Sequence, residues 1–268
     1  MLLRIYFLLI LFICSRTAAA QTAALLKSIP INARFHTVDE LGNAYIVRFD
    51  NTLLRFNEHG DSTGFYKSIL NGEIGMIDAT NPLRVLVYYP AYAKVIILDR
   101  MLAPKNELDL RKINLSNVTA IASSADGTLW VYDRFNARLK KVDDQLREIV
   151  QSNDLRQELR AAPYPKFMTE RNWQTYLCDS ARGIYIFDRY GSYVNNFPIL
   201  NVEQLQVVGA TLIYRVNDSL YSWDQARVKE SRMTLPQRKQ RILNALLIRE
   251  KLYILYEKEL AIYAFSED

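Results

Sequence analysis

The chain has little cysteine, glycine, proline or histidine for its length. Its 268 residues include 2 Cys, 9 Gly, 8 Pro and 2 His, whereas 50% are hydrophobic and 24% are charged. Two cysteines exclude a disulfide scaffold, and this composition excludes a collagen-like or disordered chain. The formal net charge of +5 is small, so we expect no strong attraction to nucleic acid.

Residues that commonly carry catalysis are also scarce. His36 and His59 have no histidine or cysteine partner at the spacing of metal ligands. No Gly-x-Ser-x-Gly elbow, phosphate loop or Gly-x-Gly-x-x-Gly motif follows a strand-like run. Cys178 lies in the apolar run Thr175–Cys178, which predicts a buried, inert thiol. We therefore expect no catalytic residues, no metal ligands and no cofactor.

The N-terminal segment has the parts of a secretory signal. Arg4 precedes the ten-residue apolar run Ile5–Cys14, and Ala18–Ala20 supply a small-residue cleavage site. Ten apolar residues rise about 15 Å as a helix, which is half the hydrocarbon core of a bilayer. We expect residues 1–20 to be a signal peptide and residues 21–268 to be a single exported domain. We expect this domain to be located in the periplasm and, more specifically, to be bound at the periphery of the outer membrane.

A lipid anchor on Cys14 is the alternative to cleavage after Ala20. A lipobox places a small residue before its cysteine, whereas Ile13 is bulky, so the cleaved signal is favoured. No later segment approaches the run of about 18 uncharged apolar residues that a membrane helix needs. We therefore expect no transmembrane segment in the mature chain.

Beyond residue 30 the chain repeats a pattern of short apolar runs separated by polar turns. The clearest unit spans residues 118–150, where Asp126-Gly127 joins two apolar runs and the runs Thr128–Tyr132 and Arg138–Val142 are separated by a polar turn. Asp-Gly supplies the positive φ that a tight hairpin needs. Helical periodicity is nearly absent, so the unit predicts four antiparallel strands.

The unit recurs six times at a nearly constant interval. Its second strand is marked by Tyr45, Leu86, Trp130, Tyr176, Ile213 and Tyr253. The intervals are 41, 44, 46, 37 and 40 residues, which is the spacing of β-propeller blades. The sequence therefore predicts an all-β, six-bladed β-propeller in one domain, with aromatic side chains packed between blades. An irregular β-sandwich is the alternative, which the regular spacing disfavours.

The two chain ends predict how the ring closes. Unit six ends at Phe265 after three strands, while the apolar residues 24–31 precede unit one without a partner. We expect residues 24–31 to be the fourth strand of unit six, because a closed ring leaves no open sheet edge. Residues 152–160 depart from the strand pattern and predict one or two helical turns between units three and four.

Two surfaces are candidates for binding a partner. The first is basic and contains Arg227, Lys229, Arg232, Arg238, Lys239 and Arg241 against Glu230 alone. It is either a solvated loop between units five and six or a docking patch for an acidic partner. The second is a tyrosine-rich turn in unit two, although half of its rings could instead pack between blades. The predicted partner-binding residues are Tyr88, Tyr89, Tyr92, Arg238, Lys239 and Arg241.

Part of the sequence resembles a known group of proteins. The run Ile77–Tyr88, followed by Val95–Asp99 and Leu129–Tyr132, resembles small exported β-propeller proteins of bacteria that use type IX secretion. The likeness is clearest over residues 40–145. It implies a non-enzymatic, protein-binding role, and in its most specific form a plug-like periplasmic subunit of the type IX outer-membrane translocon. No catalytic residues come with it.

The main alternative is a ligand-binding or hydrolytic propeller. Propellers can bring acids from separate blades together around the central channel, and sequence spacing does not reveal such a site. An apolar or plugged channel favours a protein-binding module. Several convergent acids around a bound cation favour an enzyme.

The signal peptide leads to a direct prediction. N-terminal analysis of the exported protein should find Gln21, or its cyclised form, because the three alanines end at Ala20. A mature protein that begins at a lipid-modified Cys14 would contradict this expectation and attach the protein to a membrane.

Overall fold

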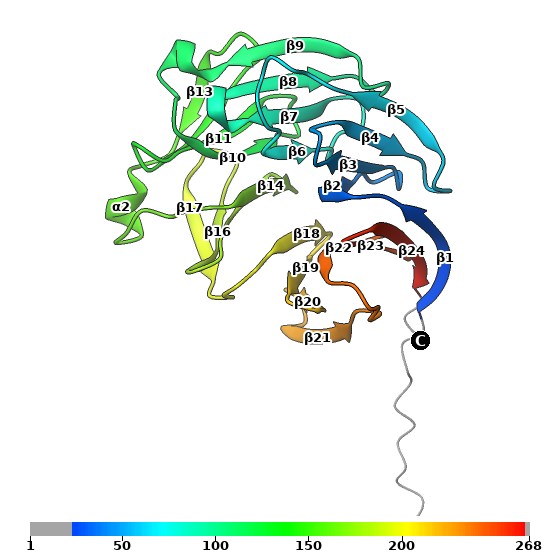
Figure 1. Ribbon diagram of the computed structural model, residues 1–268. Coiled ribbons are helices and arrows are strands. Elements are labelled where there is room, and N and C mark those ends of the chain that lie inside the picture. Colours follow the sequence, from blue (N-terminus) through cyan, green and yellow to red (C-terminus); the bar gives the residue numbers. More distant parts are fainter. Residues whose placement is uncertain (1–22, 266–268) are drawn as a thin grey trace, which may run out of the picture.

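Antiparallel strands are the main regular secondary structure of the described residues. The computed structural model describes residues 23–265, so the expected signal peptide at residues 1–20 lies outside the described residues. Within the described range, 24 strands form six four-stranded sheets. The sheets are arranged as blades around a common centre (Figure 1). The predicted six-bladed β-propeller is confirmed.

In each of blades 1 to 5 the chain runs from the innermost strand to the outermost. Blade 1 contains β2 (Ala33–Val38), β3 (Ala44–Arg48), β4 (Leu53–Phe56) and β5 (Ser62–Tyr66); blade 2 contains β6 (Met76–Asp78), β7 (Val85–Tyr89), β8 (Lys94–Leu98) and β9 (Pro104–Asp109); blade 3 contains β10 (Val118–Ser123), β11 (Leu129–Asp133), β12 (Arg138–Val142) and β13 (Glu148–Gln151). Blade 4 contains β14 (Phe167–Arg171), β15 (Gln174–Asp179), β16 (Gly183–Phe187) and β17 (Tyr193–Phe197); blade 5 contains β18 (Gln204–Val208), β19 (Thr211–Val216), β20 (Ser219–Asp224) and β21 (Lys229–Thr234). Blade 6 contains β22 (Ile242–Ile248), β23 (Lys251–Tyr256), β24 (Glu259–Phe265) and, outermost, β1 (Ala23–Pro30). The short helices are η1 (Pro90–Tyr92), η2 (Leu110–Ile113) and α2 (Leu155–Glu158).

Blade 6 takes strands from both ends of the chain. β1 pairs antiparallel with β24, from Ala23 opposite Phe265 to Pro30 opposite Glu259. Just beyond the strand, the Ile31 amide donates to the Lys258 carbonyl at 2.9 Å. This pairing confirms the expected closure of the ring by the N-terminal strand.

The apolar core is divided among the spaces between blades. Six clusters of buried residues each join side chains from two neighbouring blades. The second strand of a blade has both faces covered, and so β7 and β11 are buried at every position. This explains why these strands appear in the sequence as continuous apolar runs.

Buried aromatic side chains also bond across these interfaces. Trp130 of blade 3 is fully buried, and its Nε1 donates to the Glu170 carboxylate of blade 4 at 2.5 Å. The Tyr253 hydroxyl of blade 6 donates to the Gly42 carbonyl of blade 1 at 3.0 Å. Burial of the phenol raises the Tyr253 pKa to about 12. The expected packing of aromatic rings between blades is confirmed.

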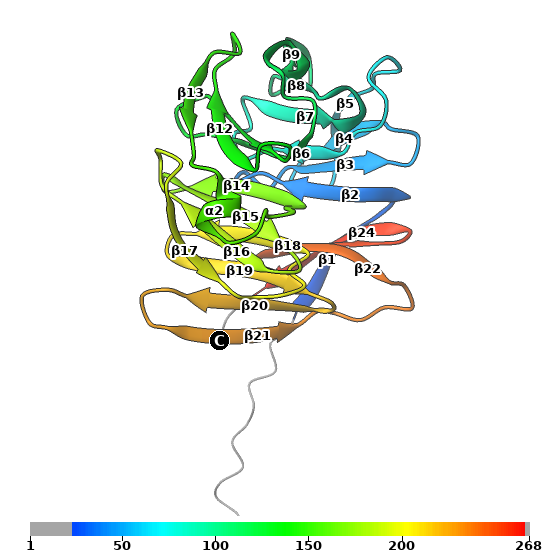
Figure 2. The ribbon, with the colours of Figure 1, turned by 90° about the vertical axis from the view of Figure 1, so that its left-hand side faces the viewer.

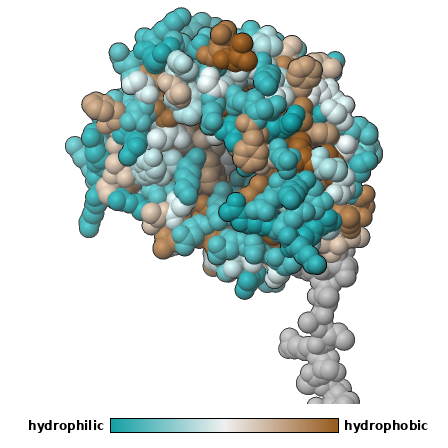
Figure 3. Space-filling view, viewed as in Figure 1, coloured by the Kyte–Doolittle hydropathy of each residue, from teal (hydrophilic) through white to brown (hydrophobic). Residues whose placement is uncertain are grey.

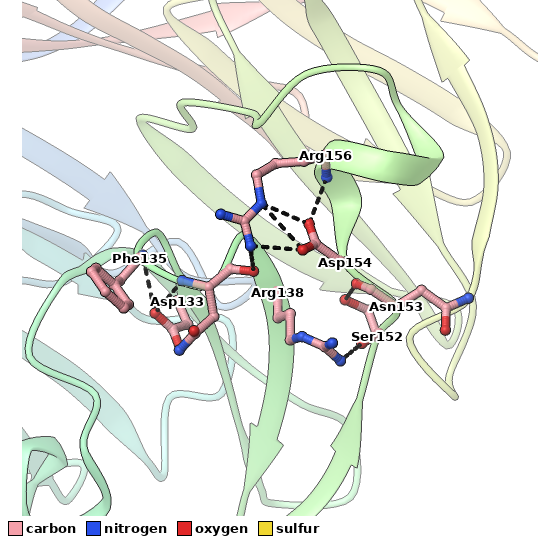
Figure 4. A network of polar contacts seen from close by, with 8 residues as sticks. Asp133, Phe135, Arg138, Ser152, Asn153, Asp154 and Arg156 are labelled. Atoms are coloured by element: carbon pink, nitrogen blue, oxygen red, sulfur yellow. Dashed lines mark hydrogen bonds and ion pairs between the residues drawn. The ribbon is translucent and has the colours of Figure 1, made fainter.

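The connection between blades 3 and 4 contains the predicted helical turn. The Asp154 side chain accepts a hydrogen bond from the Arg156 amide and caps α2. The Arg156 guanidinium reaches both the Asp154 carboxylate, at 2.6 Å, and the Asn136 carbonyl, at 3.4 Å (Figure 4). Arg138 donates to the Ser152 carbonyl at 3.0 Å. This network fastens the connection to blade 3.

One part of the basic segment is not a loop. Residues Lys229–Thr234 form β21, the outermost strand of blade 5, because they pair with β20 along its whole length. The alternative that residues 227–241 are a solvated loop is therefore wrong for this stretch. Only the residues after β21 connect blade 5 to blade 6.

The inter-blade role of Trp130 can be tested by stability. Trp130→Ala should lower the free energy of unfolding by about 3–5 kcal/mol, because it leaves a cavity and removes the partner of Glu170. Phe65→Ala, at an exposed site on β5, should change it by less than about 0.5 kcal/mol. Urea denaturation measures both. Equal losses in the two variants would contradict the packing.

Candidate functional site

The two faces of the ring carry different sets of loops. In the side view the strands run across the molecule and their connections lie at its two ends (Figure 2). Because neighbouring strands are antiparallel, the connections between blades emerge beside the turns that join each second strand to the third. We call this the inter-blade face. The opposite face carries the turns between first and second strands and between third and fourth strands.

Two of the three predicted tyrosines do not reach the surface. Tyr88 and Tyr89 are the last residues of β7 and are 2% and 0% exposed. The Tyr88 hydroxyl donates to the Val118 carbonyl at 2.9 Å, and the Tyr89 ring lies in the core between blades 1 and 2. The expectation that these two rings are exposed is wrong, since consecutive positions of this strand face two neighbouring blades. Tyr92, in η1 on the inter-blade face, is 43% exposed.

Of the three predicted basic residues, one is bonded within the fold and two are exposed. The Arg238 guanidinium pairs with Glu259 at 2.6 Å and donates to the Tyr263 hydroxyl at 2.9 Å. It lies 5.5 Å from the centre of the Tyr256 ring, so Arg238 attaches the connection between blades 5 and 6 to blade 6. Lys239 and Arg241 are exposed on the inter-blade face. The structure thus places the exposed candidates Tyr92, Lys239 and Arg241 on one face, in blade 2 and after blade 5, whereas Arg227, in the β20–β21 turn, lies on the opposite face.

An exposed apolar group on this face was not predicted from the sequence. The loop of residues 67–75 connects blades 1 and 2, and its Ile69 and Leu70 are 88% and 81% exposed. Phe49, in the β3–β4 turn, is also exposed. We call Phe49, Ile69, Leu70 and Tyr92 the apolar knob. Short apolar runs in this chain are mostly buried strands, and the pair Ile69-Leu70 has the same appearance in the sequence. Its exposure could therefore not be predicted.

The loop that carries Ile69 and Leu70 is firmly anchored. The Asn51 side chain donates to the Gly72 carbonyl and accepts from the Ile74 amide, both at 2.7 Å. The Arg34 guanidinium donates to the Asn51 side chain and to the Ile74 carbonyl, both at 3.0 Å. Arg34 also pairs with Glu73 at 3.0 Å. These contacts hold residues 72–74, the second half of the loop, close to the exposed Ile69 and Leu70.

A cavity of about 840 Å³ occupies the centre of the ring and is lined by the innermost strands. The surface is hollowed near its centre in Figure 3, among mainly hydrophilic residues. The wall is mixed, with apolar side chains such as Phe35 and Phe167 and acids at Glu40, Asp78 and Glu250. The Asp78 carboxylate accepts hydrogen bonds from the Thr80 and Ser123 amides. The channel is thus neither purely apolar nor plugged.

The described residues offer few reactive groups. Within residues 23–265 no three His, Cys, Asp or Glu side chains lie close enough together to hold a metal ion. Cys178 is buried, as expected, and burial raises the pKa of its thiol. Over the same described range, no helix has both the length and the apolar character to cross a bilayer.

His36 is buried between blades 1 and 6, and neither of its ring nitrogens is hydrogen-bonded to another residue of the described range 23–265. Burial, and next the positive charge of Arg215, lower the pKa of the imidazole from 6.5 to about 3. The ring is therefore neutral in the folded protein. The sequence expectation of a structural histidine agrees with this position.

The fold defines the class of protein: this chain is a β-propeller. No protein-family model matches the sequence, and no curated protein sequence matches it. Solved structures share the fold. A protein of unknown function from Bacteroides thetaiotaomicron gives a TM-score of 0.66 at 11% identity, covering 92% of this chain and 73% of that one.

Two further structures extend over almost the whole ring. The Pan2 WD40 domain of Neurospora crassa gives a TM-score of 0.60 at 9% identity and covers 93% of this chain and 97% of its own. Virginiamycin B lyase from Staphylococcus aureus gives 0.61 at 10% identity and covers 89% and 98%. At such identities the likeness establishes the fold alone, and the three proteins include a lyase and a WD40 domain.

The buried imidazole predicts a pH dependence of stability. Below pH 6.5 the unfolded chain binds a proton on His36 that the folded chain does not bind until about pH 3, so stability falls as the pH falls through this window. Between about pH 8 and pH 5 the wild type should lose about 2 kcal/mol more than His36→Leu. Urea denaturation at each pH measures the difference. Parallel losses in the two proteins would contradict a neutral buried imidazole.

Proposed function

We propose that the protein is a non-enzymatic, exported protein-binding module that docks a partner through the apolar knob of its inter-blade face. The carrying observation is the exposure of Ile69 and Leu70 on a loop whose residues 72–74 are held by Asn51 and Arg34. Burying each aliphatic side chain against a partner contributes about 1.5–3 kcal/mol. A fixed loop loses little conformational freedom on binding, which favours docking further.

The basic residues supply a second element of the proposed surface. Lys239 has no ion pair within the described residues, and Arg241 approaches Glu257 only at 3.5 Å. They lie on the same face as the apolar knob, in the connection from blade 5 to blade 6. Exposed charges at the rim of an interface mainly change the association rate and its dependence on salt. We therefore assign the binding energy to the apolar knob and steering to Lys239 and Arg241.

The finer form of the proposal comes from the sequence resemblance. In that form the partner is a component of an outer-membrane protein translocon, and the propeller is a plug-like periplasmic subunit at its inner mouth. Such a subunit must detach when cargo arrives, which calls for a small apolar contact with a polar surround rather than a large apolar interface.

The test compares the apolar knob with a matched pair of exposed apolar residues elsewhere. Tagged wild-type protein, Ile69→Ser/Leu70→Ser and the control Ile149→Ser/Val228→Ser are used to recover proteins from detergent-extracted membranes, followed by mass spectrometry. Recovery of the wild-type partner should fall at least about tenfold in the first variant and stay unchanged in the control. Lys239→Glu/Arg241→Glu should slow association and reduce its salt dependence.

Each outcome bears on the proposal. Folding of every variant is checked by its melting temperature, since all four apolar residues are exposed and their replacement should not lower it. Equal recovery by the two double variants would exclude the apolar knob. A wild-type protein that recovers no membrane protein would exclude the translocon form. Binding of the wild type to protein-free vesicles, lost in Ile69→Ser/Leu70→Ser, would assign the apolar knob to a lipid surface instead.

A further inference from the structure

The opposite face of the ring has an unusual set of turns around the mouth of the central cavity. The turns that join first and second strands in blades 1, 3 and 5 place glycine at positive φ, namely Gly42, Gly127 and Gly209. The same turn in blade 4 has Asn172 and Trp173 at φ 54° and 62°, and in blade 6 Arg249 and Glu250 at 47° and 59°. Side chains other than glycine are strained in this region, a tryptophan more than an asparagine. Both turns are two-residue hairpin turns, which need positive φ at their central residues, and blade 4 has an asparagine and a tryptophan there instead of glycine.

The strained turn of blade 4 holds an aromatic platform. The Asn172 side-chain amide donates to the Gly209 carbonyl of blade 5 at 2.8 Å and fixes the turn. The Arg189 guanidinium lies 4.9 Å from the centre of the Trp173 ring and 5.3 Å from that of Tyr190. Trp173 remains 44% exposed and Tyr190 65% exposed. Two large rings are thus held open to solvent on this face, next to Asn172, which lines the cavity, and a cation lies between them.

The rim of the cavity on this face carries free polar groups of both kinds, contributed by blades 1, 4 and 6. Glu40, Arg171, Arg249 and Glu250 line the cavity. Within residues 23–265 none of these four side chains forms an ion pair. Two guanidinium groups and two carboxylates give no net charge, and so the rim does not select an anion or a cation. It offers donors and acceptors together, which match hydroxyl groups.

From these three features we infer that this mouth of the channel is a binding site for a neutral carbohydrate. Trp173 and Tyr190 contact the apolar face of one sugar ring of an oligosaccharide at blade 4, and the polar side chains of the rim bind hydroxyl groups of the rings that extend across the mouth. The cavity of about 840 Å³ has the size of small-molecule sites. This site is independent of the apolar knob, which lies on the other face.

The experiment titrates the mature protein with four neutral trisaccharides: maltotriose, cellotriose, mannotriose and chitotriose. Isothermal titration calorimetry should detect saturable binding of at least one of them. Trp173→Gly should weaken that binding at least about tenfold while the melting temperature does not fall, because glycine relieves the positive φ of the turn. Trp173→Tyr, which keeps a ring, should retain part of the affinity. A loss of binding together with a stable fold separates recognition from structure.

Tyr164 supplies a matched control. It is an exposed aromatic residue stacked by Arg134, whose guanidinium lies 4.0 Å from its ring centre, on the inter-blade face. Tyr164→Ala should leave saccharide binding unchanged. Binding of none of the four trisaccharides, or equal affinity in Trp173→Gly and the wild type, would overturn the inference. Tighter binding of glucose 6-phosphate than of glucose would also overturn it, because the rim would then select an anion.

Discussion

The pairing of β1 with β24 is the constraint on which the rest of the structure depends. It joins the two ends of the described chain in one sheet and leaves no blade with a missing strand. Each blade buries its apolar faces only against its two neighbours, so the six clusters of the core exist together only in a closed ring. The closed ring also fixes which loops share a face.

Polar contacts between innermost strands reinforce this closure around the channel. The Gln206 side chain of blade 5 accepts from the Leu247 amide at 2.9 Å and donates to its carbonyl at 3.2 Å, in blade 6. The Asn244 side chain of blade 6 donates to the His36 carbonyl of blade 1 at 3.1 Å. Such contacts satisfy backbone groups that would otherwise be left unpaired at the inner edge of a sheet. A ring closed by these contacts can remain folded although its loops contain exposed aliphatic residues and strained turns.

The architecture could be predicted from the sequence because the spacing of the second strands stays regular although the residues at matching positions of the six units differ. Every second-strand marker, from Tyr45 to Tyr253, lies on the second strand of its blade. The surfaces were less predictable. Tyr88 and Tyr92 belong to the same tyrosine-rich segment, yet the end of β7 between them decides which is buried. The positive φ of Trp173 has no local sequence signal, because the pairing of Arg171 with Gln174 across the turn imposes it.

Removal of residues 23–30 tests the closed ring most directly. The truncated chain should lose several kcal/mol of unfolding free energy in urea, because blade 6 loses its outer strand and the apolar side chains that pack against Ile29, such as Leu260 and Ile262, become exposed. Its unfolding should also spread over a broader range of urea concentrations, since an open ring no longer unfolds as one unit. A truncated chain with the midpoint and slope of the wild type would contradict the account, because the ring would then not depend on the strand that closes it.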